Sequence, residues 1–428
     1  MQYGLIGERL GHSFSPELHR RFGRYDYELF ELSPSALGAF LQRRDFLGLN
    51  VTIPYKQAVL SYLDRLDARA AAIGAVNTVV NRCGQLWGYN TDFGGMAASL
   101  RRLLGASSGA AQNVLAGKTA LILGTGGTSR TALAVCMALG AAEIVRVSRT
   151  GREGALTYAE ALTRFGAPSG ADRKRLVLLN CTPAGMFPDG DGLPFHPADF
   201  PLLDGVFDCV YNPLRTRLVL AARKRGLPAG GGLSMLVRQA ALACAEFTGA
   251  PVAEAEVEAA CSALRLTRET LVLIGMPSAG KTTVGRLLAQ RLGREFADTD
   301  EWIVRRCGMS IPEVFARRGE AFFRAMEAEA VRELASTGGK VLATGGGAIL
   351  REDNVRRLRQ SGRLYFLDRP LEALTPSDDR PLSNRLEKLQ ALYTTRLPRY
   401  RAAADCVISA PDSPEAAVAA ILQDWNGS

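Results

Sequence analysis

The chain has 428 residues, of which 47% are hydrophobic and 22% are charged, and its formal net charge is +9 at pH 7. This length predicts roughly three domains at about 150 residues each, and the composition excludes a disordered or fibrous protein. Arginines are spread along both halves without an aromatic-interleaved basic stretch, so we expect small anionic substrates and no nucleic acid.

No segment resembles a targeting signal or a membrane span. Residues 1–8 lack a basic region followed by a long apolar one, and no later apolar run is long enough to cross a bilayer. The eight cysteines include no CxxC pair, and the three histidines have no metal-ligand spacing. We therefore expect a cytoplasmic protein with unpaired thiols and no membrane contact; a homodimer is left open.

Short β-rich runs alternate with helical segments, the α/β pattern of parallel sheets covered by helices. The expected strands are residues 119–123, 143–147, 176–180, 206–210, 271–274, 340–343 and 364–367. Helices are expected over 129–139, 233–264 and 283–292, and the Gly/Ser/Ala-rich stretch 100–117 is expected to adjoin a domain hinge. A new domain should begin near Arg268.

Four polar motifs lie upstream of the first glycine-rich loop: GHSFSP (11–16), NVTIPYK (50–56), AVNT (75–78) and YNTD (89–92). Two hydroxyls at alternate positions can converge on one carboxylate, and asparagine amides can bind ring hydroxyls. A lysine beside an aspartate suits proton transfer to a carbonyl that becomes an alcohol. Each motif alone would also fit a turn or a helix cap, whereas their joint order is more specific.

The first glycine-rich loop follows an apolar strand and precedes a helix. Glycines let the backbone approach a pyrophosphate, and the helix N-terminus offers N–H donors. The residues expected to bind this dinucleotide are Gly124, Thr125, Gly126, Gly127, Thr128 and Ser129.

The next strand ends in Ser148, Arg149, Thr150 and Arg152, where binders of NAD carry an acid. Arginines there would attract a 2′-phosphate, so the turn favours NADP; a solvated basic turn is the alternative.

These motifs resemble shikimate dehydrogenase over residues 1 to about 266, together with NCTPAGM (180–186), YNP (211–213) and GLSMLVRQ (232–239). The resemblance implies NADPH-dependent, reversible reduction of 3-dehydroshikimate to shikimate. It implies a substrate-binding domain over 1–93 and 233–266 and a Rossmann NADP domain over 94–232. The implied substrate residues are Ser13 and Ser15 for the ring carboxylate, Thr52, Asn77, Asp92 and Gln239 for the hydroxyls, and Tyr211, with Lys56 and Asp92 carrying the proton. The family's usual asparagine is replaced by Ser148.

The second glycine-rich loop has the spacing GxxxxGKT. Its backbone N–H groups can wrap phosphates, its lysine can neutralise developing charge, and its threonine hydroxyl can ligate Mg²⁺. The residues expected to bind this nucleotide are Gly275, Met276, Pro277, Ser278, Ala279, Gly280, Lys281, Thr282 and Thr283. Asp298 and Asp300 lie just after the helix that follows the loop, where one carboxylate could organise the water shell of the magnesium and the other could orient an attacking hydroxyl.

Further along the chain, Arg324 and Glu327 are one helical turn apart, a spacing that a surface ion pair would also explain. Glycines 345–347 follow a strand and would admit a ligand closely. Arg380 and Arg396 add cationic groups, although solvated arginines are the alternative at both positions.

This half resembles shikimate kinase over residues 268 to about 425. The resemblance implies ATP- and Mg²⁺-dependent phosphorylation of shikimate by a P-loop domain spanning 268–428. The implied shikimate contacts are Asp300, Arg324, Gly346, Gly347 and Arg396, while Lys281 and Arg380 would meet the transferred phosphoryl group. The lid region 368–379 is shorter than the family's and lacks the arginine that usually precedes it.

Together the two resemblances imply a bifunctional enzyme that makes shikimate and then phosphorylates it. One alternative is an active dehydrogenase whose kinase-like domain serves only as a regulatory ligand-binding module. Another is a quinate-active dehydrogenase that uses NAD, suggested by Ser148.

Overall fold

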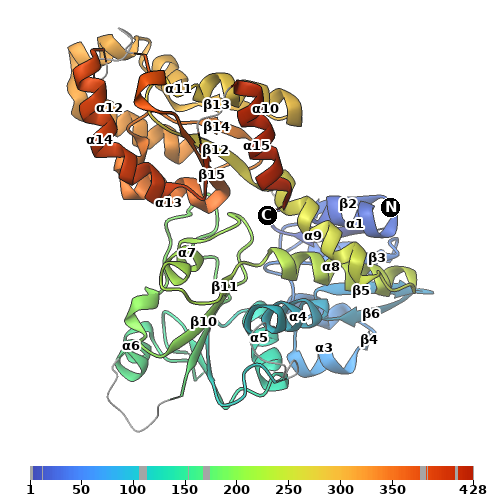
Figure 1. Cartoon of the computed structure of the whole chain (residues 1–428). Coiled ribbons are helices and arrows are strands. Elements are labelled where there is room, and N and C mark those ends of the chain that lie inside the picture. Colours follow the sequence, from blue (N-terminus) through green and yellow to red (C-terminus); the bar gives the residue numbers. More distant parts are fainter. Residues whose placement is uncertain are drawn as a thin grey trace. The chain divides into compact units, whose positions relative to one another are not determined.

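The computed structural model describes residues 3–11, 13–105, 113–152, 154–166, 174–375, 382, 384–409 and 413–427. The chain forms two compact units (Figure 1). The first comprises Met1–Met186, Asp191–Tyr211 and Ala221–Ala263, and the second comprises Phe187–Gly190, Asn212–Leu220 and Leu264–Ser428. Two short segments that precede the sequence boundary near Arg268 thus belong to the second unit.

The first sheet of the first unit has the strand order β2-β1-β3-β5-β6-β4. Its strands are β1 (Tyr3–Gly7), β2 (Tyr27–Glu31), β3 (Gly48–Val51), β4 (Arg65–Leu66), β5 (Thr78–Arg82) and β6 (Gln85–Tyr89). Its helices are α1 (Ser15–Gly23), α2 (Leu37–Gln42), η1 (Ala58–Tyr62) and α3 (Ala68–Ile73).

This first sheet is mixed, although the sequence pattern predicted parallel sheets. Strand β5 runs antiparallel to both β3 and β6. The reason is local: Cys83 and Gly84 both have positive φ, 52° and 85°, which closes β5 and β6 into a two-residue hairpin.

The second sheet of the first unit has the order β11-β10-β9-β7-β8, and all its pairings are parallel. Its strands are β7 (Thr119–Leu123), β8 (Glu143–Val147), β9 (Leu176–Asn180), β10 (Leu203–Asp208) and β11 (Ala229–Gly230). The accompanying helices are α4 (Thr91–Gly105), α5 (Gly127–Ala138), α6 (Tyr158–Phe165), η2 (Pro197–Asp199) and α8 (Leu233–Thr248). Helix α7 (Arg217–Lys224) is divided between the units, because its residues up to Leu220 belong to the second. The predicted bounds of β7, β8 and β9 are confirmed, whereas β10 begins three residues earlier than predicted.

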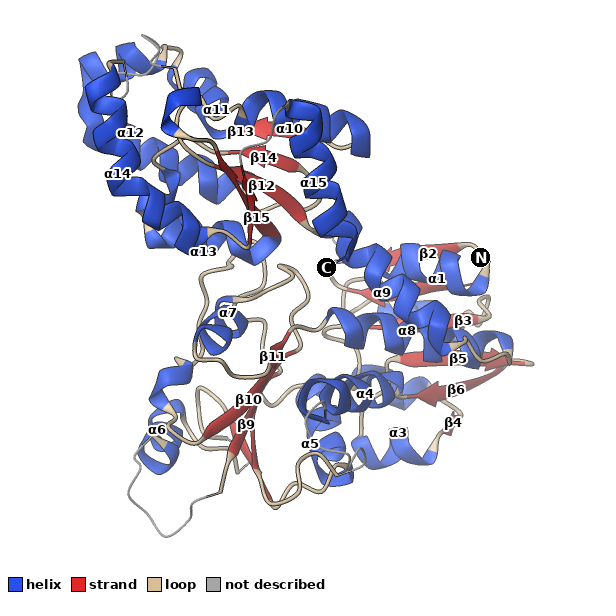
Figure 2. Cartoon of the chain, viewed as in Figure 1, coloured by secondary structure: helices blue, strands red, loops and turns tan. Residues whose placement is uncertain are grey.

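The second unit contains a parallel sheet of order β13-β14-β12-β15-β16 (Figure 2). Its strands are β12 (Thr270–Ile274), β13 (Phe296–Asp298), β14 (Val341–Ala343), β15 (Gly362–Asp368) and β16 (Cys406–Ser409). Its helices are α10 (Lys281–Leu292), α11 (Thr299–Cys307), α12 (Ile311–Leu334), η3 (Ala348–Leu350), α13 (Glu352–Ser361), η4 (Leu371–Ala373), α14 (Leu386–Ala403) and α15 (Pro414–Gly427). Helix α9 (Glu254–Arg268) leads into β12.

Strand β12 is the centre of this sheet, and all five of its residues are buried. A fully apolar strand is what a parallel sheet covered on both faces requires. Because β12 ends at Ile274, it delivers the second glycine-rich loop to the carboxyl edge of the sheet, where ligands bind in open α/β folds. Among the described helices, none is both long and apolar enough to cross a membrane.

Candidate functional sites

The first glycine-rich loop lies at the carboxyl end of β7, as its motif predicted. Gly124 has φ 107°, and a Cβ there would lie 3.2 Å from the Thr182 side chain and 3.4 Å from the Cys181 carbonyl oxygen. Gly126 is the N-cap of α5. The loop therefore presents glycine backbone and a helix N-terminus at the carboxyl end of β7, which fits a pyrophosphate.

Ser129 contributes to the shape of this loop. Its hydroxyl donates to the Gly124 carbonyl at 2.6 Å, and the residue is buried. Its side chain thus braces the loop and is not turned toward solvent.

The basic turn after β8 is built around Ser148. The Ser148 hydroxyl accepts a hydrogen bond from the Gly151 amide at 3.1 Å. Arg149, Thr150 and Arg152 are exposed and so face the solvent from which a nucleotide would arrive. With serine at position 148 the turn is closed by this hydrogen bond, and Arg149 and Arg152 remain exposed.

The predicted proton-transfer pair is formed. Lys56 Nζ lies 2.6 Å from Asp92 Oδ2, and both side chains are largely buried. Asp92 sits in the first turn of α4. A Cβ on Gly127 would lie 3.2 Å from Lys56 Cβ, so the dinucleotide loop packs directly against the lysine. This contact puts a proton-carrying group next to the loop expected to hold the hydride donor.

Two of the predicted hydroxyl-binding residues, Asn77 and Gln239, share one buried hydrogen-bond network. The Asn77 amide nitrogen donates to Thr91 Oγ1 at 2.9 Å and to Gln239 Oε1 at 3.3 Å, although Asn77 and Gln239 are 162 residues apart. The Asn77 oxygen accepts from the Thr91 amide at 2.7 Å. Thr91 holds this network together and was not among the predicted site residues, although it lies in the YNTD motif.

The serine motif comes next to Tyr211. Ser13 Oγ accepts from the Ser15 amide at 3.3 Å, and the intervening Phe14 ring lies 5.3 Å from the Tyr211 ring. Burial raises the pKa of Tyr211, so its hydroxyl stays protonated at neutral pH. Thr52, the remaining predicted contact, is half-buried just after β3.

The second glycine-rich loop opens onto a cavity of about 310 Å³. Its lining residues come from the loop, β13, α11, α12, the glycine run after β14, and α14. They are Pro277, Ser278, Ala279, Gly280, Lys281, Thr282, Thr283, Asp298, Asp300, Ile311, Phe315, Phe323, Arg324, Glu327, Thr344, Gly345, Gly346, Gly347, Leu382 and Arg396. Gly275 and Met276 contribute carbonyls beneath the loop, each 2.9 Å from Lys281 Nζ.

The donors predicted for Mg²⁺ are in contact. Thr282 Oγ1 donates to Asp298 Oδ2 at 2.9 Å, while Asp298 Oδ1 accepts from the Asp300 amide at 2.9 Å and caps α11. A hydroxyl and a carboxylate beside a phosphate loop are hard oxygen donors of the kind that Mg²⁺ prefers. The residues present therefore fit the metal.

Arg324 and Glu327 form an ion pair in which the carboxylate is buried and the guanidinium is partly buried, so the alternative of a solvated surface pair is wrong. Arg324 Nη1 lies 2.9 Å from Glu327 Oε2, and Glu327 is fully buried. Burial raises the pKa of Glu327, and the Arg324 guanidinium opposes that shift. A Cβ on Gly347 would overlap the Arg324 guanidinium, so the glycine makes room for it.

Arg396 is also buried rather than solvated. Its Nη1 donates to the Gly346 carbonyl at 3.1 Å, and burial lowers the pKa of the guanidinium. Arg380 lies outside the described residues, so its role remains a prediction.

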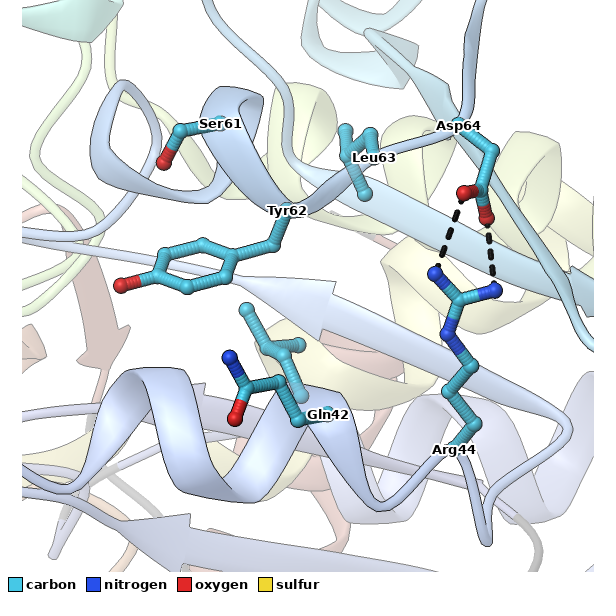
Figure 3. A pocket seen from close by; sticks show the side chains of 7 residues that line it. Gln42, Arg44, Ser61, Tyr62, Leu63 and Asp64 are labelled. Atoms are coloured by element: carbon cyan, nitrogen blue, oxygen red, sulfur yellow. Dashed lines mark hydrogen bonds and ion pairs between the residues drawn. The ribbon is translucent and has the colours of Figure 1, made fainter.

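A smaller cavity of about 250 Å³ lies elsewhere in the first unit (Figure 3). Its charged groups neutralise each other, because Arg44 contacts both Asp64 oxygens, at 2.9 and 3.0 Å. None of its lining residues belongs to the predicted sites.

Comparisons with known proteins agree with both expected families. Residues 277–426 match the family model for shikimate kinase, and residues 5–79 match that for the shikimate dehydrogenase substrate binding domain. The shikimate dehydrogenase (NADP(+)) of Symbiobacterium thermophilum is 39% identical over 267 residues, covering 56% of this chain and 86% of the relative. That of Moorella thermoacetica is 36% identical over 301 residues, covering 65% and 96%. The chain belongs to the shikimate dehydrogenase family.

Its membership explains the first unit, and a shikimate kinase domain explains the second. A solved structure of shikimate 5-dehydrogenase from Thermus thermophilus, in complex with NADP(H) and shikimate, is 31% identical with a TM-score of 0.51. It covers 61% of this chain and 98% of its own. The predicted fold class, a shikimate dehydrogenase-like α/β protein joined to a P-loop kinase domain, is thereby confirmed.

Several residues that line the kinase cavity were not predicted, because apolar residues on a helix are also typical of a hydrophobic core. Ile311, Phe315 and Phe323 form an apolar wall of the kinase cavity, and the two phenylalanine rings lie 4.7 Å apart. Apolar residues on a helix read as core. The sequence also did not predict that two cysteines lie close together. Cys181 and Cys209 are 28 positions apart, but they follow the neighbouring strands β9 and β10, and their sulfurs are 3.8 Å apart.

Proposed function

We propose that this chain catalyses two consecutive reactions. The first is the reversible, NADPH-dependent reduction of 3-dehydroshikimate to shikimate, and the second is the phosphorylation of the 3-hydroxyl of shikimate by ATP and Mg²⁺. The observation that carries the proposal is that Lys281 and Thr282 line one cavity with Asp300, Arg324 and Arg396. Phosphate-binding and acceptor-binding groups thus share a site, in a chain whose first unit belongs to a dehydrogenase family.

In the dehydrogenase reaction, bound NADPH supplies the hydride. Lys56 Nζ gives a proton to the carbonyl oxygen during reduction and takes it back in reverse. Asp92, at 2.6 Å, orients the lysine. Asn77 and Gln239 bind ring hydroxyls, and the hydroxyls of Ser13 and Ser15 bind the ring carboxylate. The word NADP(+) in the names of both curated relatives supports the cofactor assignment.

In the kinase reaction, magnesium-bound ATP supplies the phosphoryl group. Thr282 would ligate the metal and Asp298 would act on it through water, while Lys281, now 2.9 Å from two loop carbonyls, would bind phosphate oxygens. Asp300 accepts the proton of the attacking hydroxyl. Arg324 and Arg396 bind the ring carboxylate, for which guanidinium groups are suited.

The test supplies purified protein with 3-dehydroshikimate, NADPH, ATP and Mg²⁺ and follows both NADPH consumption and shikimate 3-phosphate. We expect both signals from the wild type, and Asp300→Asn should abolish only the second. In a separate assay with added shikimate, Lys281→Met should abolish ADP release. Absence of shikimate-dependent ADP release in the wild type would instead favour the regulatory module.

The cofactor assignment is tested by comparing catalytic efficiencies with NADP and NAD, using shikimate and quinate in turn. We expect a preference for NADP and shikimate. Equal efficiency with both nucleotides, or a preference for quinate, would favour the alternative dehydrogenase.

A further inference from the structure

A buried tyrosine lies behind the acceptor side of the kinase cavity and does not line it. Tyr400, on α14, is fully buried. Its hydroxyl donates to the Gly346 carbonyl oxygen at 2.5 Å. Arg396, one turn earlier on the same helix, donates to that same oxygen at 3.1 Å. One backbone carbonyl therefore receives two donors from adjacent turns of α14.

The tyrosine ring is itself fixed by the central sheet. It stacks on Phe366, with ring centroids 5.1 Å apart and planes at 7°. Phe366 belongs to β15, which pairs with β12 on one side and β16 on the other. Parallel stacking on a buried strand restricts the ring, so the hydroxyl has one direction in which to donate.

Gly346 links this support to the phosphate loop. A Cβ on Gly346 would lie 3.0 Å from Pro277 Cδ, so the glycine backbone packs against the loop. The amide of the preceding Gly345 donates to buried Thr299 Oγ1 at 2.7 Å. The glycine run is thus held from three directions, by Thr299, by Pro277 and by Tyr400.

We infer that Tyr400 is a positioning residue for the acceptor site. By fixing the Gly346 carbonyl, its hydroxyl sets the place of the Arg396 guanidinium and of the glycine backbone that faces shikimate. Arg396 is buried, so it depends on a correctly placed acceptor to stay oriented. The inference rests on the proposed kinase function, because it concerns how that site binds its acceptor.

The test is Tyr400→Phe, which removes one oxygen and keeps the stacked ring. We expect the KM for shikimate in the kinase reaction to rise about tenfold, the effect of one lost hydrogen bond to a site that binds a charged group. The kcat should change by less than about twofold, because Tyr400 contacts neither the hydroxyl nor the phosphates.

The matched control is Tyr365→Phe in the same unit. Tyr365 is also fully buried, and its hydroxyl donates to Asp424 at 3.0 Å, outside the residues that line the cavity. It should leave the KM for shikimate unchanged, even if it lowers thermal stability. Dehydrogenase activity of both variants reports that the rest of the chain is intact.

Two outcomes would overturn the inference. If Tyr400→Phe and Tyr365→Phe gave the same KM for shikimate, the Tyr400 hydroxyl would serve packing alone. If the wild type released no ADP with shikimate, the proposed kinase function would fail and the inference with it. Kinetics on the wild type separate these two cases.

Discussion

The two candidate active sites differ in how the charges of their side chains are compensated before a ligand binds. In the dehydrogenase site the polar groups satisfy one another: Lys56 pairs with Asp92, and Asn77 bonds Thr91 and Gln239. The carbonyl and hydroxyls of the substrate ring are neutral, so they can enter this preformed network by exchanging hydrogen bonds. The charges of the ligands, on the ring carboxylate and the NADPH phosphates, would be met outside this network, at the serine motif and at the first glycine-rich loop.

The kinase cavity must accept a highly charged nucleotide. Its cations, Lys281, Arg324 and Arg396, are matched in number by its carboxylates, Asp298, Asp300 and Glu327. The described lining thus carries no excess positive charge for a triphosphate. Mg²⁺ and an arginine from the lid region, where Arg380 lies, would have to supply it. The difference teaches that proton transfer can use a preformed charge pair, while phosphoryl transfer here needs positive charge beyond that of the described cavity lining.

The largest effect we expect comes from Lys56→Ala, which removes the Lys56–Asp92 pair of the first site. Losing a positioned acid–base group should lower the dehydrogenase kcat by about 10²–10⁴-fold. Phosphorylation of added shikimate should be unchanged, which serves as the internal control. Equal loss of both activities would mean that the two sites are not independent.

Gly347→Ala tests the arginine clamp of the second site. A Cβ would overlap the Arg324 guanidinium and displace it from its pairing with Glu327. We expect the KM for shikimate in the kinase reaction to rise roughly 10- to 100-fold, as for a lost charge-assisted contact. Gly427→Ala is the control, because a Cβ there meets no atom within 4 Å. An unchanged KM in Gly347→Ala would show that Arg324 does not bind the acceptor.

Arg149→Gln should weaken NADP specifically. Arg149 is exposed beside the turn closed by Ser148, and one charged contact to a 2′-phosphate is worth about tenfold in affinity. The KM for NADP should rise by that factor while the KM for NAD stays constant. A parallel rise in both would indicate a collapsed turn, and the kinase KM for ATP should not move.

A last prediction concerns stability and distinguishes the two units by pH. His19 is fully buried, its Nδ1 is hydrogen-bonded to the Tyr25 hydroxyl at 2.7 Å and its ring is stacked on Tyr27, and burial lowers its pKa to about 3. In the unfolded chain the histidine has its ordinary pKa of 6.5, so below that pH the unfolded state binds a proton that the folded state does not. The free energy of unfolding of the first unit should therefore fall by about 1.6 kcal/mol between pH 6.5 and pH 5.

The second sequence half beyond Arg268 contains no histidine, so it should lack this slope. Chemical denaturation followed by dehydrogenase and kinase activity separately would measure both. His19→Gln should flatten the pH dependence of the first unit, and His196→Gln, at an exposed helix cap, should not. A slope retained in His19→Gln would assign the effect to other groups.

The sequence alone determined the chemistry of each half. The glycine loops, the turn with Arg149 and the motifs with Lys56 and Asp298 follow local rules, because phosphate contact depends on consecutive backbone N–H groups. Buried apolar runs likewise placed β7, β8 and β9 at their observed bounds. These features depend only on residues that are neighbours in the sequence, so they can be predicted from the sequence.

Tertiary structure decided which residues meet. The structure shows that the Glu327 carboxylate paired with Arg324 is buried, which helical spacing alone did not show. It also shows that Gly127 packs against Lys56. It also joined Tyr400 to Gly346, 54 positions away. Burial and contact depend on how strands and helices that are distant in the sequence pack together. Neither the spacing of Arg324 and Glu327 nor the presence of Tyr400 in the sequence predicts that packing.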